Sequence, residues 1–162
     1  MGWFVVVADG RSHLATRERF PEADAVRVLP IADLPQTASA HFDPRPTDAA
    51  VMMTHSFEQD SSVLAALLAL ETPPAYMGVL GPQRRTRELL AEAATLLHLP
   101  ATENRLDAWL ARLHAPTGLD LGAETPAAVA LSILAEIQKV LGAATGEPLR
   151  QVRATPQAVA PR

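Results

Sequence analysis

Three arginines stand at the start of a helix that the apolar spacing predicts over residues 82–99. Arg84, Arg85 and Arg87 fall in its opening turns, after Gly81 and Pro82, with Pro82 expected as the first helical residue. Cations at this end oppose the helix dipole by about 0.3–1 kcal/mol each. An anion bound to the free N–H groups would reverse that cost. The spacing indicates an anion site, with solvated or acid-paired arginines as the alternative.

A second candidate group lies in "MMTHSFEQD" (52–60). Thr54 and His55 are expected where a parallel strand ends, which is the edge at which α/β sheets gather ligands. We interpret His55 as a hydrogen-bonding lining residue, and a structural histidine is an equally good alternative. His55, Glu58 and Asp60 match no metal-ligand spacing, and Asp60 suits a helix N-cap. We therefore predict no metal site.

Asp9 and Arg11 stand at the end of another predicted strand, in "ADGR" (8–11). As functional groups they would bind a sugar hydroxyl and a phosphate. The alternative is an ordinary Asp-Gly turn followed by a surface arginine.

The loop before the last predicted helix carries more polar residues than a connector needs. Thr125 is a plausible N-cap for that helix, but His114, Gly118, Asp120 and Glu124 have no such explanation. A glycine here indicates a close backbone approach. Asp120 and Glu124 could accept hydrogen bonds from the donor edge of a pterin or guanine ring. They could equally stabilise the helix N-terminus, or act as a catalytic carboxylate pair.

Apolar runs alternate with helical patterns along the chain. Four strands are predicted within residues 3–9, 25–30, 49–55 and 75–81, and the first of them is expected to be buried. Four helices are predicted over residues 60–70, 82–99, 105–113 and 126–141, the last ended by Gly142 in the left-handed conformation. This alternation is typical of the α/β class, a Rossmann-like doubly wound, mainly parallel sheet. We expect one domain over residues 1–145 and a flexible tail over 146–162.

The glycine-rich turn of dinucleotide-binding folds is absent from this sequence. None of its 8 glycines forms the Gly-x-Gly-x-x-Gly spacing whose bare backbone approaches a pyrophosphate. Moreover, Asp9 ends the first strand, whereas such folds place a ribose-binding acid on the second. The chain therefore reads as if it starts after its own first βα unit.

Composition excludes several classes of function. The 162 residues are 48% hydrophobic and carry a net charge of −4, so nucleic acid is not expected as a partner. The absence of cysteine excludes disulfides, thiolate metal sites and thiol nucleophiles. No apolar segment is long enough to span a bilayer, and we expect a cytoplasmic protein without a membrane partner.

Four blocks of the sequence, in order, carry a family resemblance. They are "MGWFVVVADGR", "VMMTHSFEQD", "YMGVLGPQRRTRELL" and "LHAPTGLDLGAETPAAVALSILAEI". Over residues 2–142 the chain resembles the C-terminal Rossmann-type domain of the XdhC/CoxI family, accessory proteins of molybdenum hydroxylases such as xanthine dehydrogenase. The resemblance implies a non-catalytic protein that binds the molybdenum cofactor, protects it during sulfuration and delivers it to the apo-hydroxylase.

The family pattern differs from this sequence at two places. Family members carry a cysteine-containing N-terminal domain, a first strand and its glycine turn before this region, and a serine where Pro82 stands. A truncation, a miscalled start, a split gene and a short paralogue all remain open as origins. We expect the missing strand to leave an unpaired edge that a homodimer or an exchanged element covers.

Two other functions also stay open. One is an NAD(P)-binding Rossmann oxidoreductase, which the missing glycine turn disfavours. The other is a protein-interaction module without a ligand. In the leading hypothesis, the arginines hold the pterin phosphate and the loop carboxylates hold the ring.

Overall fold

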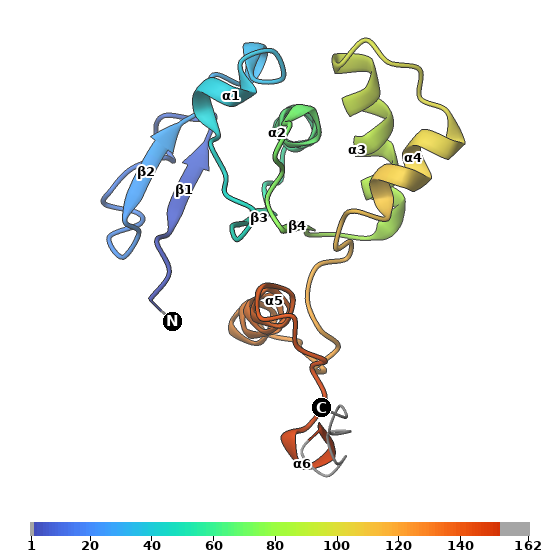
Figure 1. Cartoon of the computed structure of the whole chain (residues 1–162). Coiled ribbons are helices and arrows are strands. Elements are labelled where there is room, and N and C mark those ends of the chain that lie inside the picture. Colours follow the sequence, from blue (N-terminus) through green and yellow to red (C-terminus); the bar gives the residue numbers. More distant parts are fainter. Residues whose placement is uncertain (1, 153–162) are drawn as a thin grey trace, which may run out of the picture. The chain divides into compact units, whose positions relative to one another are not determined.

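The computed structural model describes residues 2–152 (Figure 1). They fall into two compact units, of which one ends at Thr117 and the other begins at Gly118. The predicted domain boundary at residue 145 stays a prediction. Residues 153–162 of the predicted tail lie outside the described residues.

Four strands, all in the first unit, pair in parallel. Strand β1 (Val6–Asp9) pairs with β2 (Ala25–Val28), and β3 (Ala49–Met52) pairs with β4 (Tyr76–Val79). Each strand lies inside a predicted run and is shorter than that run. The α/β class with parallel strands is confirmed.

The four strands form two separate sheets rather than one. Among the described residues, β1 hydrogen-bonds only to β2 within its sheet, and β3 only to β4 within its own. The prediction that residues 3–9 are a buried strand is wrong, because Val6 is 43% exposed and Phe4 is 72% exposed. Among the described residues, no element covers the side chains of Phe4 and Val6.

Helix α2 (Phe57–Ala69) follows β3 and begins earlier than predicted. Ser56 is its N-cap, and the Ser56 side chain accepts a hydrogen bond from the Gln59 N–H. The predicted cap, Asp60, is wrong because this residue already lies inside the first turn. Its carboxylate is buried there and bonds other elements.

Helices α3 (Gln83–Leu96) and α4 (Glu103–Leu110) follow β4. Pro82 is the N-cap residue of α3 rather than its first helical residue, with an extended ψ of 149°. Between β2 and β3 lie a short 3-10 helix, η1 (Ile31–Asp33), and the single turn α1 (Ala38–His41).

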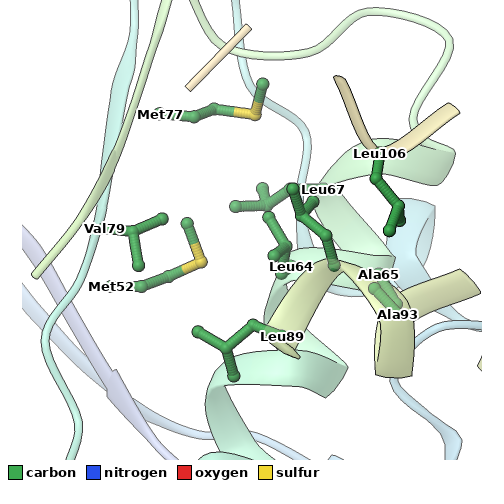
Figure 2. Packing of buried hydrophobic residues seen from close by; sticks show 10 residues of the cluster. Met52, Leu64, Ala65, Leu67, Met77, Val79, Leu89, Ala93 and Leu106 are labelled. Carbon is green, nitrogen blue, oxygen red and sulfur yellow. The ribbon is translucent and has the colours of Figure 1, made fainter. Parts of the chain in front are cut away.

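The main hydrophobic core joins the β3–β4 pair to the helices that follow it. Figure 2 shows side chains from both strands and from α2, α3 and α4 meeting in one cluster. Its buried members are Met52, Leu64, Ala65, Leu67, Met77, Val79, Leu89, Leu90, Ala93 and Leu106. A smaller cluster links α2 to the segment after β2 through Leu29, Leu34, Ala38 and Ala66.

The second unit is built on α5 (Pro126–Leu141), whose bounds match the prediction. Thr125 caps it by accepting from the Ala128 N–H, as expected. The prediction of a left-handed Gly142 is wrong: its φ is −88°, and Ala143 takes the positive φ of 47° instead. A four-residue helix, α6 (Leu149–Val152), lies within the predicted tail.

None of the helices in the described part of the chain combines the length and the apolar composition needed to cross a membrane.

Candidate functional site

The segments that follow β1, β3 and β4 meet at the first turn of α2. The Gly10 N–H, just after β1, donates to Gln59 Oε1 at 2.9 Å. Arg85, just after β4, donates to Asp60 Oδ2 at 2.6 Å. Because Gln59 and Asp60 are neighbours in α2, one edge of the first unit gathers all three strand ends. We call residues 9–11, 54–60 and 81–85 the carboxyl edge.

A buried carboxylate organises the β3 and β4 side of this edge. Asp60 is 1% exposed and receives two hydrogen bonds: from Arg85 Nη2, and from Thr54 Oγ1 at 2.7 Å. A buried carboxylate without partners is strongly unfavourable, so these two donors compensate for the burial of the Asp60 side chain. The result is a guanidinium held at the strand ends by a fixed anion.

Arg85 keeps capacity for another acceptor. Its side chain is 25% exposed, and a guanidinium has five N–H donors. Three residues before Arg85, Pro82 is the N-cap residue of α3 and provides no side-chain cap for the first N–H groups of the helix. Gly81 has a φ of 117°, which favours glycine, and it leads the chain into this turn. The arrangement suits an anion.

Arg84 lies differently from Arg85. Its side chain is 91% exposed, and Nε donates to Glu88 Oε1 at 3.1 Å, one turn along the same helix. For Arg84, the structure thus shows the pairing with an acid that the sequence offered as the alternative to an anion site. A role of Arg84 in anion binding stays a prediction.

Asp9 and Arg11 pair with each other after β1. Arg11 donates from Nε to Asp9 Oδ1 at 3.0 Å and from Nη2 to Oδ2 at 2.9 Å, and its backbone N–H donates to Oδ1. These hydrogen bonds hold the pKa of the Asp9 carboxyl below its usual value, although burial acts in the opposite direction. The same pair raises the pKa of Arg11. The turn presents a preorganised Asp–Arg pair.

The predicted lining residues Thr54 and His55 differ in burial and in their contacts. Thr54 is half-buried and belongs to the Asp60 network, where its hydroxyl also accepts from the Ser56 N–H at 3.1 Å. His55 is exposed beside it at the carboxyl edge. Both therefore stand at one edge with Arg85, as expected for residues that follow parallel strands.

His114 makes contacts that support the fold. Its backbone bonds Met77 and Val79 on both sides of Gly78, which extends the β3–β4 sheet by a single bridge. The imidazole stacks on the ring of Tyr76 at 4.2 Å between centroids. Its predicted part in cofactor binding is untested.

The other predicted loop residues lie in the second unit. The Gly118 N–H donates to Glu136 Oε2 at 2.8 Å, and a Cβ on Gly118 would lie 2.5 Å from Ser132 Oγ. The glycine is thus needed for close packing on α5. Asp120 and Glu124 are exposed. Their ligand roles stay predictions.

Two long-range contacts, one in each unit, were not predicted from the sequence. Gln59 anchors Gly10, and Glu136 anchors the Gly118 backbone. Both partners are remote in sequence, 49 and 18 residues away, and no local spacing signals such contacts.

Comparisons with known proteins show the family of the chain. The family model described as the XdhC Rossmann domain matches residues 1–137. The chain belongs to this family. As an XdhC-family chain it is 32% identical over 136 residues to a probable xanthine dehydrogenase subunit of Bacillus subtilis, covering 84% of this chain and 35% of that protein.

Two further comparisons agree. The chain is 33% identical over 146 residues to the uncharacterized protein YqeB of Escherichia coli, covering 90% of this chain and 24% of the relative. A crystal structure described as a xanthine dehydrogenase from Bacillus halodurans superposes with a TM-score of 0.61 at 30% identity, covering 98% of this chain and 38% of that one. This chain therefore spans about a third or less of the curated relatives' length.

Proposed function

We propose that this XdhC-family chain binds the molybdenum cofactor and assists its insertion into a xanthine dehydrogenase-type molybdenum hydroxylase, without catalysing a reaction itself. Membership of the family supports an association with xanthine dehydrogenase, as do the names of two proteins that it resembles. The structural observation that carries the proposal is Arg85, held by Asp60 beside the uncapped start of α3.

The carboxyl edge fits the anionic part of such a cofactor. A phosphate would be held by the first N–H groups of α3 and by the free donors of Arg85, because helix N-termini and guanidinium groups both favour phosphate oxygens. Asp60 acts as a positioning residue: it fixes Arg85 and leaves donors for the ligand. Arg11 adds a second cation at the same edge, after β1.

The pterin ring would need acceptors for its N–H groups. Asp120 and Glu124 are exposed carboxylates in the second unit and suit this role. When bound, the cofactor supplies the molybdenum chemistry of the hydroxylase that receives it. In this proposal the residues of the chain bind and orient it.

Titration of the full chain with molybdenum cofactor, and separately with NAD and NADP, tests this function. We expect saturable binding of the cofactor that weakens with added salt, since partly exposed charge contacts are screened. Binding of NAD(P) alone would favour the oxidoreductase, and binding of neither would favour an interaction module.

Two arginines of α3 provide a matched comparison in that titration. Arg84→Ala removes a cation at the start of the helix that is 91% exposed and pairs with Glu88, whereas Arg87→Ala removes one that pairs with Glu103 and Asp107 of α4. We expect a larger loss of cofactor affinity in the first variant. Equal losses would argue against phosphate binding at the start of α3.

A further inference from the structure

Helices α2 and α3 and the 3-10 helix η1 enclose a hollow of about 270 Å³. All three elements belong to the first unit, and Figure 1 shows α2 between α1 and α3. Residues four positions apart lie one above the other on a helix, so one face of each helix reaches the hollow. The walls include Phe57, Glu58 and Ser62 of α2, Glu92 and Leu96 of α3, and Ile31 of η1.

Two carboxylates line the hollow without a cation beside them. Glu58 and Glu92 form no ion pair within the part of the chain that the structure describes. Arg85 of α3 donates to Asp60 instead. Among the described residues that line the hollow, none is a lysine, an arginine or a histidine. The hollow is therefore acidic and suits a cationic group.

The hydroxyl of Ser62 is open to a hydrogen-bond donor. Ser62 is 5% exposed, and its side chain forms no hydrogen bond with any described residue. The neighbouring Ser61 differs, because its hydroxyl donates to the Phe57 carbonyl oxygen at 2.7 Å. Since Ser62 lines the hollow, its oxygen can accept from a donor that enters between the two carboxylates.

The rest of the wall is apolar. Phe57 is 43% exposed, and Ile31 and Leu96 are half-buried. An aromatic ring attracts a cation over its face, and apolar walls pack against the methylene stem of a long basic side chain. Pockets for small molecules usually measure about 300–1,000 Å³, so this hollow has the size for one side chain.

We propose that the hollow receives an arginine side chain of a partner protein, with an apolar residue beside that arginine packing on the exposed ring of Phe57. A planar guanidinium carries five donors, which can serve both carboxylates and the Ser62 hydroxyl at once. The ammonium group of lysine is a single point of charge and fits this wide acceptor set less well. The proposal does not depend on cofactor binding.

The charge of the chain favours a different protein over a second copy. The 162 residues carry a net charge of −4, so two copies repel each other. A basic segment of another protein is attracted to the same surface. Arginine in a pocket is also a frequent source of binding energy at protein interfaces.

The probe is the peptide acetyl-Gly-Ser-Leu-Arg-Leu-Ser-Gly-amide, titrated into the nitrogen-15-labelled full chain and followed by NMR. One control peptide carries citrulline in place of arginine, which keeps the shape and removes the charge, and another carries lysine. We expect the arginine peptide to bind most tightly and the citrulline peptide least. Binding should shift the amide signals of residues 57–62 and 92–96 together.

Two variants test the walls of the hollow. Glu92→Gln keeps the shape of the side chain and should weaken binding of the arginine peptide by about fivefold, as for the loss of one favourable ion pair. Ser62→Ala should give a smaller loss. Glu88→Gln is the matched control: it lies one turn before Glu92 on α3 and removes the same charge, but it does not line the hollow. Its affinity should equal that of the wild-type chain.

Equal binding of the arginine and citrulline peptides, an equal loss in Glu88→Gln, or no shifts in residues 57–62 and 92–96 would overturn the proposal. Equally tight binding of N-acetylargininamide would assign the hollow to a small guanidinium compound instead. A dimer in light scattering that Glu92→Gln abolishes would assign it to a second copy. Thermal melts by circular dichroism check folding, and if a variant does not fold, the peptide comparison on the wild-type chain decides.

Discussion

The β3–β4 pair and the β1–β2 pair are alike in strand length and in parallel pairing, but the first is buried and the second is largely exposed. Each consists of two parallel four-residue strands. Val79 ends β4 and is fully buried, whereas Val28 ends β2 and is 51% exposed. Helices α2 and α3 cover the first of these valines, whereas Val28 belongs to neither hydrophobic cluster of the described residues. Burial thus depends on the elements that cover a strand, in addition to its own sequence.

The ion pairs that follow the strands show the same difference in burial. The Asp60–Arg85 pair after β3 and β4 contains a carboxylate that is 1% exposed, whereas Asp9 and Arg11 after β1 are 16% and 42% exposed. The buried pair fixes a cation between elements, and the exposed pair orders only its own turn. We therefore regard the β3–β4 half as the rigid platform of the carboxyl edge.

Removal of Arg85 should have the largest effect on stability. Arg85→Ala leaves the buried Asp60 carboxylate without its cationic partner, and we expect a loss of about 3 kcal/mol in the free energy of unfolding. Arg11→Ala, the counterpart on the β1–β2 side, should change it far less, because exposed pairs contribute little. Urea unfolding followed by circular dichroism measures both. Equal losses would remove the distinction between the halves.

Truncation of the two strand-ending valines should give the next largest difference. Val79→Ala should cost about 2 kcal/mol, since it leaves a cavity in the main core. Val28→Ala should stay within about 0.5 kcal/mol, as is usual for exposed positions. The same unfolding experiment compares them. A comparable cost at Val28 would mean that the β1–β2 pair is covered in solution.

Much of the fold followed from local sequence patterns. The four strands were found because continuous apolar runs end at polar residues, and α5 was placed correctly because Thr125 and Pro126 give a strong start signal. Patterns failed where tertiary contacts decide. Asp60 has the residue type of an N-cap, but Ser56 caps α2 and Arg85 recruits Asp60 into the interior.

The candidate site could be predicted only in part. The meeting of Thr54, His55 and Arg85 at one edge follows from parallel strands, whose carboxyl ends share a side of the sheet. The different roles of Arg84 and Arg85 could not be predicted, because neighbouring residues on a helix point about 100° apart and only packing shows which one faces Asp60. The Gln59–Gly10 contact joins residues 49 positions apart, and no local pattern signals it.

The most direct test of the central claim is hydrogen exchange of the full chain with and without bound molybdenum cofactor. The claim is that three strand ends form one anion-binding edge. It predicts that the cofactor slows exchange together in residues 9–11, 54–60 and 81–85, with little change over α4. Protection confined to one of these segments, or found only outside them, would contradict it.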